Sequence, residues 1–198
     1  MSYGVNAPQG LRPVRYLNGA PWVGTLNAYP IASGYNTAIY TQDPVISLSD
    51  GTIGIGVAGS AYRGVFMGVK YNDSTNYPKF MPYWAASTAT YGSAQATALI
   101  LDDPNMVFDI QESASSPPGT PLALADRNLN ANFAVAAGST ATGLTGTYLN
   151  NASEATTSTL NLKIIDLTPV PGNVVGNYAN WLVTWNTHEL KSVGTTGV

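Results

Sequence analysis

The sequence predicts an all-β protein, built either as a β-sandwich or as a small barrel. Three observations support this prediction. Roughly eight short segments alternate apolar and polar residues with the period of two that is typical of strands. Turn-forming residues separate these segments, since the 198 residues include 20 glycines and 13 prolines. Almost no segment has the period of a helix.

The first part of the chain, residues 1–41, differs from residues 42–198, which we expect to form the β domain. Prolines recur along the first part, and aromatic residues and glycines stand between them. Proline at this density opposes helix and interrupts the hydrogen bonds of a sheet. We therefore predict an extended N-terminal arm with a short strand piece near Ala38–Thr41. Such an arm cannot bury Trp22 by itself, so it must lie on its own domain or on a neighbouring molecule.

The clearest strand pattern covers residues 43–56. Asp50-Gly51 is a two-residue hairpin signal, because glycine tolerates the positive φ of a type I′ turn. Directly opposed residues share a face of the sheet. A hairpin closed at this turn would pair Leu48 with Ile53 and Ile46 with Ile55.

A third strand is expected at residues 63–71, because apolar residues follow each other there for several positions, as in the middle of a packed sheet. Strict alternation would divide this strand into two faces. One face would hold Val65, Met67, Val69 and Tyr71, and the other Phe66, Gly68 and Lys70.

Residues 72–95 are expected to form a long loop, in which aromatic residues are concentrated and prolines interrupt any strand. A long connection within a compact domain usually serves a function or forms a contact. After it we predict a strand pair at residues 97–101 and 105–112, joined by the turn Asp102–Asn105.

The last third of the chain predicts fewer and shorter strands. Pro121 opens a short helical turn within residues 122–130, and a strand is expected at residues 131–137. Residues 138–159 indicate exposed strand and loop. Further strands are expected at residues 160–164 and 180–190, with Trp181, Val183 and Trp185 on one face of the latter.

The composition favours a neutral surface, because only 10% of the residues are charged, against roughly 25% in an ordinary soluble domain. Such a surface tends to associate unless another molecule covers it. The chain is thus either a simply neutral β protein or, as we favour, part of an assembly. The net charge is −3 and no basic stripe is present, which argues against nucleic-acid binding. We expect no membrane span and no signal peptide.

The residues that usually carry catalysis are sparse. There is no cysteine, hence no thiolate nucleophile and no Cys-based metal site. His188 is the only histidine, so a Ser-His-Asp triad would have to use it, and no G-x-S-x-G elbow accompanies it. The adjacent carboxylates of Asp102 and Asp103 are explained by their turn. We expect no enzyme, no catalytic residue, no metal and no cofactor.

Aromatic residues are the one enriched group in the predicted loops. Three uses compete. The rings could stack on sugars, which would make a carbohydrate-binding or adhesin-type domain that loses glycan binding on Trp84→Ala. They could anchor a protein interface, because Tyr and Trp bring large contact area. They could also simply cover the core. The residues concerned are Trp22, Tyr77, Tyr83, Trp84 and Tyr91.

Several short segments follow the N-terminal arm in a fixed order. They are LNGAPW (17–22), SDGTI (49–53), GVFMGVKY (64–71), PYW (82–84), LDDPNMVFDIQ (101–111), NLNANF (128–133), STLNL (158–162), PGN (171–173) and NTHE (186–189). This order of parts, over most of the chain, resembles that of the head decoration (cement) proteins of tailed bacteriophages.

The resemblance implies a β-barrel or β-tulip-like body, or a jelly-roll-like sandwich, and no active site. It implies a protein that is made in the host cytoplasm and joins the exterior of the virion capsid. There it would bind the major capsid protein and assemble with itself as a dimer or trimer, bridging and stabilising neighbouring coat subunits. The arm residues expected to contact the coat are Tyr3, Arg12, Arg15, Tyr16 and Trp22. Second candidates, for the coat or for the oligomer interface, are Tyr77, Phe80, Tyr83 and Trp84.

Overall fold

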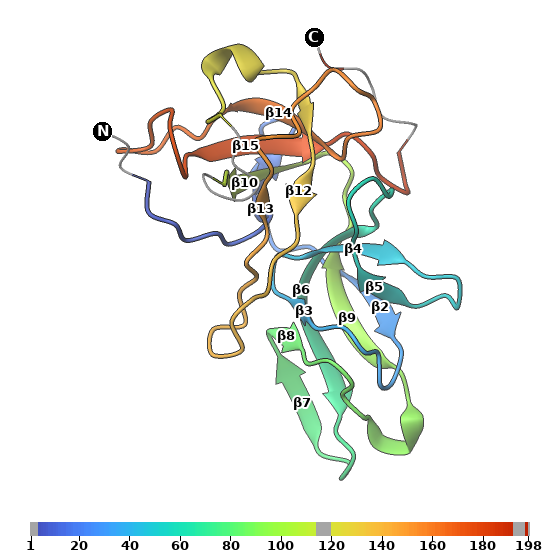
Figure 1. Cartoon of the computed structure of the whole chain (residues 1–198). Coiled ribbons are helices and arrows are strands. Elements are labelled where there is room, and N and C mark those ends of the chain that lie inside the picture. Colours follow the sequence, from blue (N-terminus) through green and yellow to red (C-terminus); the bar gives the residue numbers. More distant parts are fainter. Residues whose placement is uncertain (1–3, 114–119, 192–196, 198) are drawn as a thin grey trace.

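A computed structural model of the chain describes residues 4–113, 120–191 and 197. The all-β prediction is confirmed: the regular structure is strand, apart from two short 3₁₀ turns, η1 (Tyr91–Ser93) and η2 (Leu124–Asp126). Two large antiparallel sheets form the two halves of an elongated molecule (Figure 1). None of the described sheets closes into a barrel, and the arrangement is consistent with a β-sandwich.

The first sheet has the order β1-β10-β15-β14-β11. Its strands are β1 (Arg12–Tyr16), β10 (Met106–Gln111), β15 (Asn180–Trp185), β14 (Leu162–Leu167) and β11 (Asn130–Ala131). A small pair, β12 (Phe133–Ala134) and β13 (Tyr148–Leu149), completes this half. The predicted alternation of the last strand is confirmed, because Trp181, Val183 and Trp185 are all fully buried in the first core.

The second sheet has the order β2-β9-β6-β4-β5, with β7 paired to β6. Its strands are β2 (Asn27–Ile31), β9 (Ala96–Leu101), β6 (Gly64–Asn72), β4 (Pro44–Ser47), β5 (Ile53–Ile55) and β7 (Pro78–Met81). A further pair, β3 (Ile39–Tyr40) and β8 (Tyr83–Trp84), contributes Ile39 and Trp84 to the second core.

The chain builds the second sheet as an insertion into the first. It leaves the first sheet after β1, forms β2 to β9, and returns to the first sheet at β10. The predicted division into residues 1–41 and 42–198 does not coincide with this division into halves. The described part of the predicted arm lies on its own chain and supplies an edge strand to each sheet, with Leu11 and Ile31 fully buried.

The predicted pairing of residues 97–101 with 105–112 is wrong, although both strands and the turn between them exist. The two strands, β9 and β10, belong to different sheets. The turn is held by the Asp103 carboxylate, which accepts a hydrogen bond of 2.7 Å from the Asn105 amide. The neighbouring Asp102 side chain accepts hydrogen bonds from Asn27 and Tyr29 of the edge strand β2. A turn pattern in the sequence thus predicts where the chain changes direction. It does not predict which strand each of the two flanking strands will pair with.

The prediction of one long loop at residues 72–95 is also wrong, since it contains β7 and β8. β6 and β7 form a hairpin in which Val69 opposes Met81 and Tyr71 opposes Lys79. Pro78 and Pro82 stand at the two ends of β7, where their lack of an N–H is tolerated because β7 pairs on one side only.

The predicted register of the β4–β5 hairpin is wrong by one residue. The observed pairs are Val45 with Ile55 and Ser47 with Ile53, and the connection has three residues instead of two. Alternation could not settle this register, because both faces are covered. Val45 and Ile53 lie in the second core, whereas Ile46 packs against the first.

Strict alternation also fails along β6. A bulge between Phe66 and Gly68 shifts the register against β9. Before it, Val65 lies in the first core and Phe66 in the second; Met67, at the bulge, packs against the first core, and Val69, beyond it, lies in the second. A bulge inserts one extra residue and re-aims the side chains that follow it, so Val69 shares a core with Phe66 and not with Val65.

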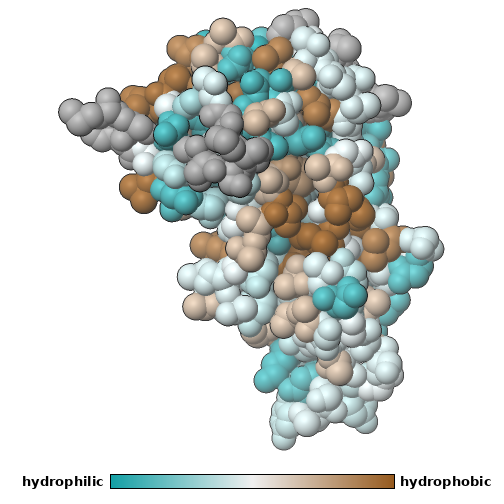
Figure 2. Space-filling view, in the orientation of Figure 1, coloured by the Kyte–Doolittle hydropathy of each residue, from teal (hydrophilic) through white to brown (hydrophobic). Residues whose placement is uncertain are grey.

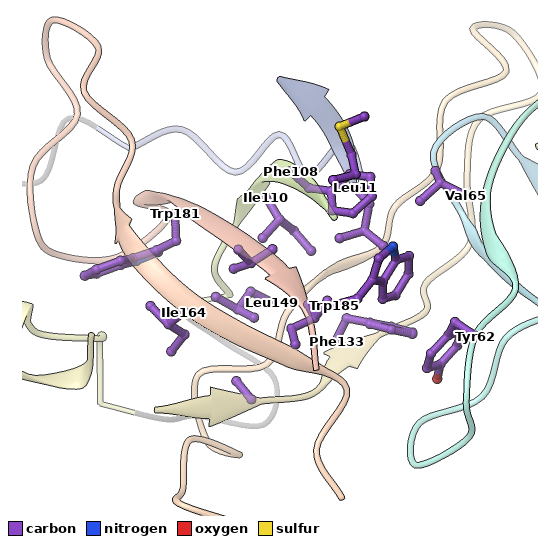
Figure 3. Close-up of a cluster of buried hydrophobic side chains, with 14 of the residues drawn as sticks. Leu11, Tyr62, Val65, Phe108, Ile110, Phe133, Leu149, Ile164, Trp181 and Trp185 are labelled. Carbon is purple, nitrogen blue, oxygen red and sulfur yellow. The ribbon is translucent and has the colours of Figure 1, made fainter. Parts of the chain in front are cut away.

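The two halves share the first core (Figure 3). Tyr62 and Val65, from the second half, point toward the strands of the first. The Tyr62 ring stacks on Trp185 at 5.5 Å between centroids and meets Phe133 edge-on at 4.9 Å. The core that is fullest in aromatic rings therefore lies at the junction of the halves.

The other predicted elements of the last third are present with different boundaries, but residues 138–159 are not all exposed, because Thr145, Thr147 and Leu149 are buried. The helical turn is η2, the strand expected at 160–164 is β14, and the last strand ends at Trp185. The strand expected at 131–137 is divided into β11 and β12, which pair with different partners.

Candidate interaction surfaces

The arm residues expected to contact a partner are engaged within the chain. Arg12 forms an ion pair of 2.6 Å with Asp109, whose side chain is fully buried. The Arg15 guanidinium donates a hydrogen bond to the Tyr16 carbonyl oxygen. Tyr16 and Trp22 are half-buried against the first core. These side chains therefore hold the first segment of the chain onto its own sheet. Tyr3 lies outside the described residues.

Two of the second candidates also belong to the interior. Trp84 is fully buried, and its indole nitrogen donates a hydrogen bond of 3.2 Å to the Tyr35 carbonyl oxygen. Tyr83 is half-buried and stacks on Tyr40 with ring centroids 5.6 Å apart. A sugar ring cannot reach Trp84 in this fold, so the predicted stacking on that residue is not available.

The other two second candidates are exposed. Tyr77 and Phe80 are 67% and 69% accessible, on the β6–β7 hairpin at the end of the molecule that is farthest from the first sheet. The Asp73 carboxylate accepts hydrogen bonds from the amides of Thr75 and Tyr77. The Thr75 hydroxyl also donates to this carboxylate, and that bond, followed by the two amide bonds, keeps the pKa of Asp73 below its ordinary value and stabilises the tip of the hairpin.

An apolar groove of about 370 Å³ lies at the junction of the two halves, and we call it the waist groove. Apolar residues gather on the surface in this region (Figure 2). They come from the end of β5 and from the segment after β12. The lining consists of Thr37, Ala38, Tyr40, Asp43, Ile55, Gly56, Val57, Val135, Ala136 and Ala137.

Asp43 is the only charged residue in the lining of the waist groove, and its carboxylate is hydrogen-bonded within the protein. Asp43 is buried, and its carboxylate accepts hydrogen bonds from the hydroxyls of Thr145 and Thr147 and from the Tyr40 amide. Burial raises the pKa of Asp43, although these hydrogen bonds oppose the rise. The groove thus presents an apolar wall to solvent, and its one carboxylate is bound by Thr145 and Thr147.

A second groove, of about 400 Å³, lies beside the β6–β7 hairpin, and we call it the distal groove. Unlike the waist groove, it has two ammonium groups and several amides and hydroxyls along its walls. Its lining consists of Lys70, Tyr71, Asn72, Pro78, Lys79, Thr90, Tyr91, Ala94, Gln95 and Thr97.

His188, the one candidate base for a triad, lies inside the fold. It is buried, and its Nδ1 accepts a hydrogen bond of 3.1 Å from the Leu190 amide. Burial lowers the pKa of His188 to about 4, so the ring is neutral near pH 7. Among residues 4–113, 120–191 and 197, no group of three or more His, Cys, Asp or Glu side chains could hold a metal ion.

Sequence reasoning missed one unusual carboxylate. Glu112 is buried at the end of β10, where Oε2 accepts a hydrogen bond of 2.9 Å from the Leu122 amide. Burial raises the pKa of Glu112 to about 7. Nothing in its sequence neighbourhood distinguishes it from an exposed residue at a strand end.

Comparison with known protein families, with curated proteins and with solved structures finds no match for this chain. In the part of the chain that the structure describes, no helix is long and apolar enough to cross a membrane.

Proposed function

We propose that the protein is a structural component of a tailed-phage virion that binds the outside of the head and bridges neighbouring major capsid proteins. The observation that carries this proposal is the waist groove, an exposed apolar surface on a chain with only 10% charged residues. Exposed apolar patches on soluble proteins mark sites where another macromolecule binds. The resemblance in the order of sequence segments names the coat protein as that partner.

The proposed contact differs from the one expected from sequence. Arg12, Tyr16 and Trp22 support the fold, so the coat contact moves to the waist groove, where Val57 is 56% exposed. This part of the groove is preformed, because its lining residue Asp43 is fixed by hydrogen bonds from Thr145 and Thr147. A preformed surface loses little conformational entropy on binding.

The proposed mechanism is a stabilisation by mass action. A ligand that binds only the assembled, expanded lattice shifts the equilibrium toward that lattice. Each contact can be weak, because many copies, each bridging more than one coat subunit, act together. Assembly of the protein with itself as a dimer or trimer would increase this avidity. In this proposal the protein is made in the host cytoplasm and resides on the capsid exterior.

Co-sedimentation with expanded heads that lack the protein tests the proposal. We expect saturation at a fixed ratio of copies to coat subunits. Val57→Asp should weaken binding at least tenfold, because it places a charge in an apolar contact. Val174→Asp is the matched control, an exposed valine in the turn before β15, and should bind like the wild type.

Each contrary result has a distinct meaning. Absence of binding by the wild-type protein overturns the decoration function. Binding that is insensitive to Val57→Asp but lost on Phe80→Ser keeps the function and moves the contact to the β6–β7 hairpin.

A further inference from the structure

We propose that the distal groove binds an acidic saccharide, that is, a sugar chain that carries carboxylate or sulfate groups. This inference goes beyond coat binding and does not depend on it. It rests on the shape of the groove, on an aromatic side chain held at its edge, and on the charges that line it.

The groove is built on a rigid floor. Residues 70–72 of β6 and Thr97 of β9 belong to neighbouring strands of the second sheet, with Lys70 directly opposite Thr97. Pro78 and Lys79 of β7 form one wall, and Tyr91, Ala94 and Gln95 form the other. A site whose floor is a paired sheet is formed before the ligand arrives, as most small-ligand sites are.

The wall at residues 91–95 is held in an unusual conformation. Thr90 donates a side-chain hydrogen bond to the Ala94 carbonyl oxygen, and its amide donates one to Ser33 Oγ. Gly92 and Ser93 have φ of 57° and 58°. A left-handed residue other than glycine costs of order 1 kcal/mol, and such residues concentrate at functional sites.

The consequence of this conformation is an exposed ring at the edge of the groove. Tyr91 is 52% accessible and lines the groove. The face of an aromatic ring packs well against the apolar C–H face of a sugar. Tyr91 can take the role that the sequence suggested for Trp84, because Tyr91 is accessible and Trp84 is not.

The charges of the lining favour an anion. Lys70 is exposed and forms no ion pair with any described residue. Lys79 Nζ lies 3.6 Å from the Asp73 carboxylate, in a pair whose side chains are 47% and 26% exposed, and such pairs near the surface are weak. No residue of the lining carries a carboxylate, in a chain whose net charge is −3. Two ammonium groups in a groove of this size match carboxylate or sulfate groups of a ligand.

The neutral polar groups match sugar hydroxyls. The side chains of Gln95 and Thr97 make no hydrogen bond to the described part of the chain and lie in the lining. Asn72 donates its amide to Asn76 at 3.0 Å, which leaves its side-chain oxygen free to accept. An acidic peptide fits less well, because extended peptides bind along open strand edges and Pro78 removes one N–H from the edge of β7.

Isothermal titration with three oligosaccharides of equal length tests the inference. The probes are oligogalacturonate, a sulfated heparin fragment and neutral maltohexaose. We expect at least one acidic probe to bind at least tenfold more tightly than maltohexaose. Which acidic probe binds distinguishes a carboxylated from a sulfated ligand. Poly-glutamate of similar length is the peptide control and should bind at least tenfold more weakly than the preferred saccharide.

Variants locate the site. Lys70→Ala should weaken binding at least fivefold, and Tyr91→Ala at least tenfold. Tyr77→Ala and Arg127→Ala, an exposed ring and an exposed cation outside the groove, should bind like the wild type. Each variant is first checked for an unchanged unfolding midpoint.

Three results would overturn the inference: no binding of any saccharide, binding unaffected by both groove variants, or equal binding of poly-glutamate. Lys70→Ala should leave co-sedimentation with heads unchanged, so failure here and failure of the decoration function are separate results.

Discussion

At the scale of single residues, two buried titratable groups make the free energy of unfolding change with pH in opposite directions. Glu112 has a folded pKa of about 7 against an ordinary 4.5, and His188 about 4 against 6.5. The contribution of Glu112 is complete below pH 4.5 and is lost as pH rises to 7. The contribution of His188 is complete above pH 6.5 and is lost as pH falls to 4. Each group changes the free energy of unfolding by about 1.4 kcal/mol per pH unit. Because the two changes have opposite signs, they cancel between pH 4.5 and 6.5.

Removing one group should expose the slope of the other. In Glu112→Gln, which can still accept the Leu122 amide, the free energy of unfolding should rise by about 1 kcal/mol per pH unit between 4.5 and 6.5. In His188→Asn it should fall by a similar amount. Urea denaturation at three pH values measures both. Flat profiles in both variants would show that neither group titrates as its burial implies.

Trp84 is buried and Phe80 is exposed, and this difference gives a second prediction for single residues. Trp84→Ala should destabilise the protein by about 3–5 kcal/mol, because it empties a buried site. Phe80→Ala should change the free energy of unfolding by about 0.5 kcal/mol or less, because the ring is exposed. Thermal or urea denaturation measures both. Similar costs for the two variants would contradict the assignment of one ring to the core and the other to the surface.

At the scale of elements, two hairpins share one construction. In each, the turn is closed by the amide of a left-handed residue: Gly51, with φ 80°, donates to the Leu48 carbonyl oxygen, and Asn76, with φ 67°, donates to that of Asp73. The amide at the start of each loop bonds across it, Leu48 to Thr52 at 2.7 Å and Asp73 to Tyr77 at 2.9 Å. Three-residue loops of this kind are common hairpin connections.

This construction gives a prediction for Gly51. An added Cβ would meet nothing within 4 Å, so Gly51→Ala should cost only the left-handed backbone penalty, about 1 kcal/mol. Gly51→Asn should cost less, because asparagine adopts this conformation in the related hairpin. Urea denaturation of the pair measures the difference. An equal loss in both variants would point to a contact at this turn instead of backbone conformation.

The elements also show where sequence reasoning succeeded and where it failed. Positions of turns and of strands such as β10, β14 and β15 follow from local residue chemistry. The partner of β9 does not, because the Asp102–Asn105 turn is compatible with a hairpin and with a change of sheet. The register of β4–β5 could not be predicted either. Both faces of this hairpin contact a core, so the alternation of residues does not indicate which face is buried.

At the scale of the whole molecule, the insertion topology ties the halves together. Val65 and Leu101 of the second sheet lie in the first core. Arg63 of the second half is 3.7 Å from Glu189 of the first and lies over the Tyr29 ring at 4.7 Å. Neither half can lose its structure without exposing apolar surface of the other.

The molecule should therefore unfold in one cooperative transition. Fluorescence of Trp84 reports the second half, and Trp22, Trp181 and Trp185 report the first. In urea, Trp84→Phe and the wild type should give single transitions that coincide with the far-ultraviolet circular dichroism signal. Val65→Ala should lower the free energy of unfolding by about 2 kcal/mol, and the urea midpoints reported by the two halves should fall together. Two separated transitions would show that the halves are independent.

Residue chemistry and local spacing suffice to predict the all-β class, the positions of several turns, the low charge and the buried face of the last strand. Which strands pair, that one strand contacts two cores, and which aromatic side chains are accessible follow only from the tertiary structure. Trp84 and Tyr91 stand seven positions apart in similar surroundings of sequence, yet one is interior and the other is exposed. Burial depends on contacts between segments that are distant in sequence, and local patterns do not encode those contacts.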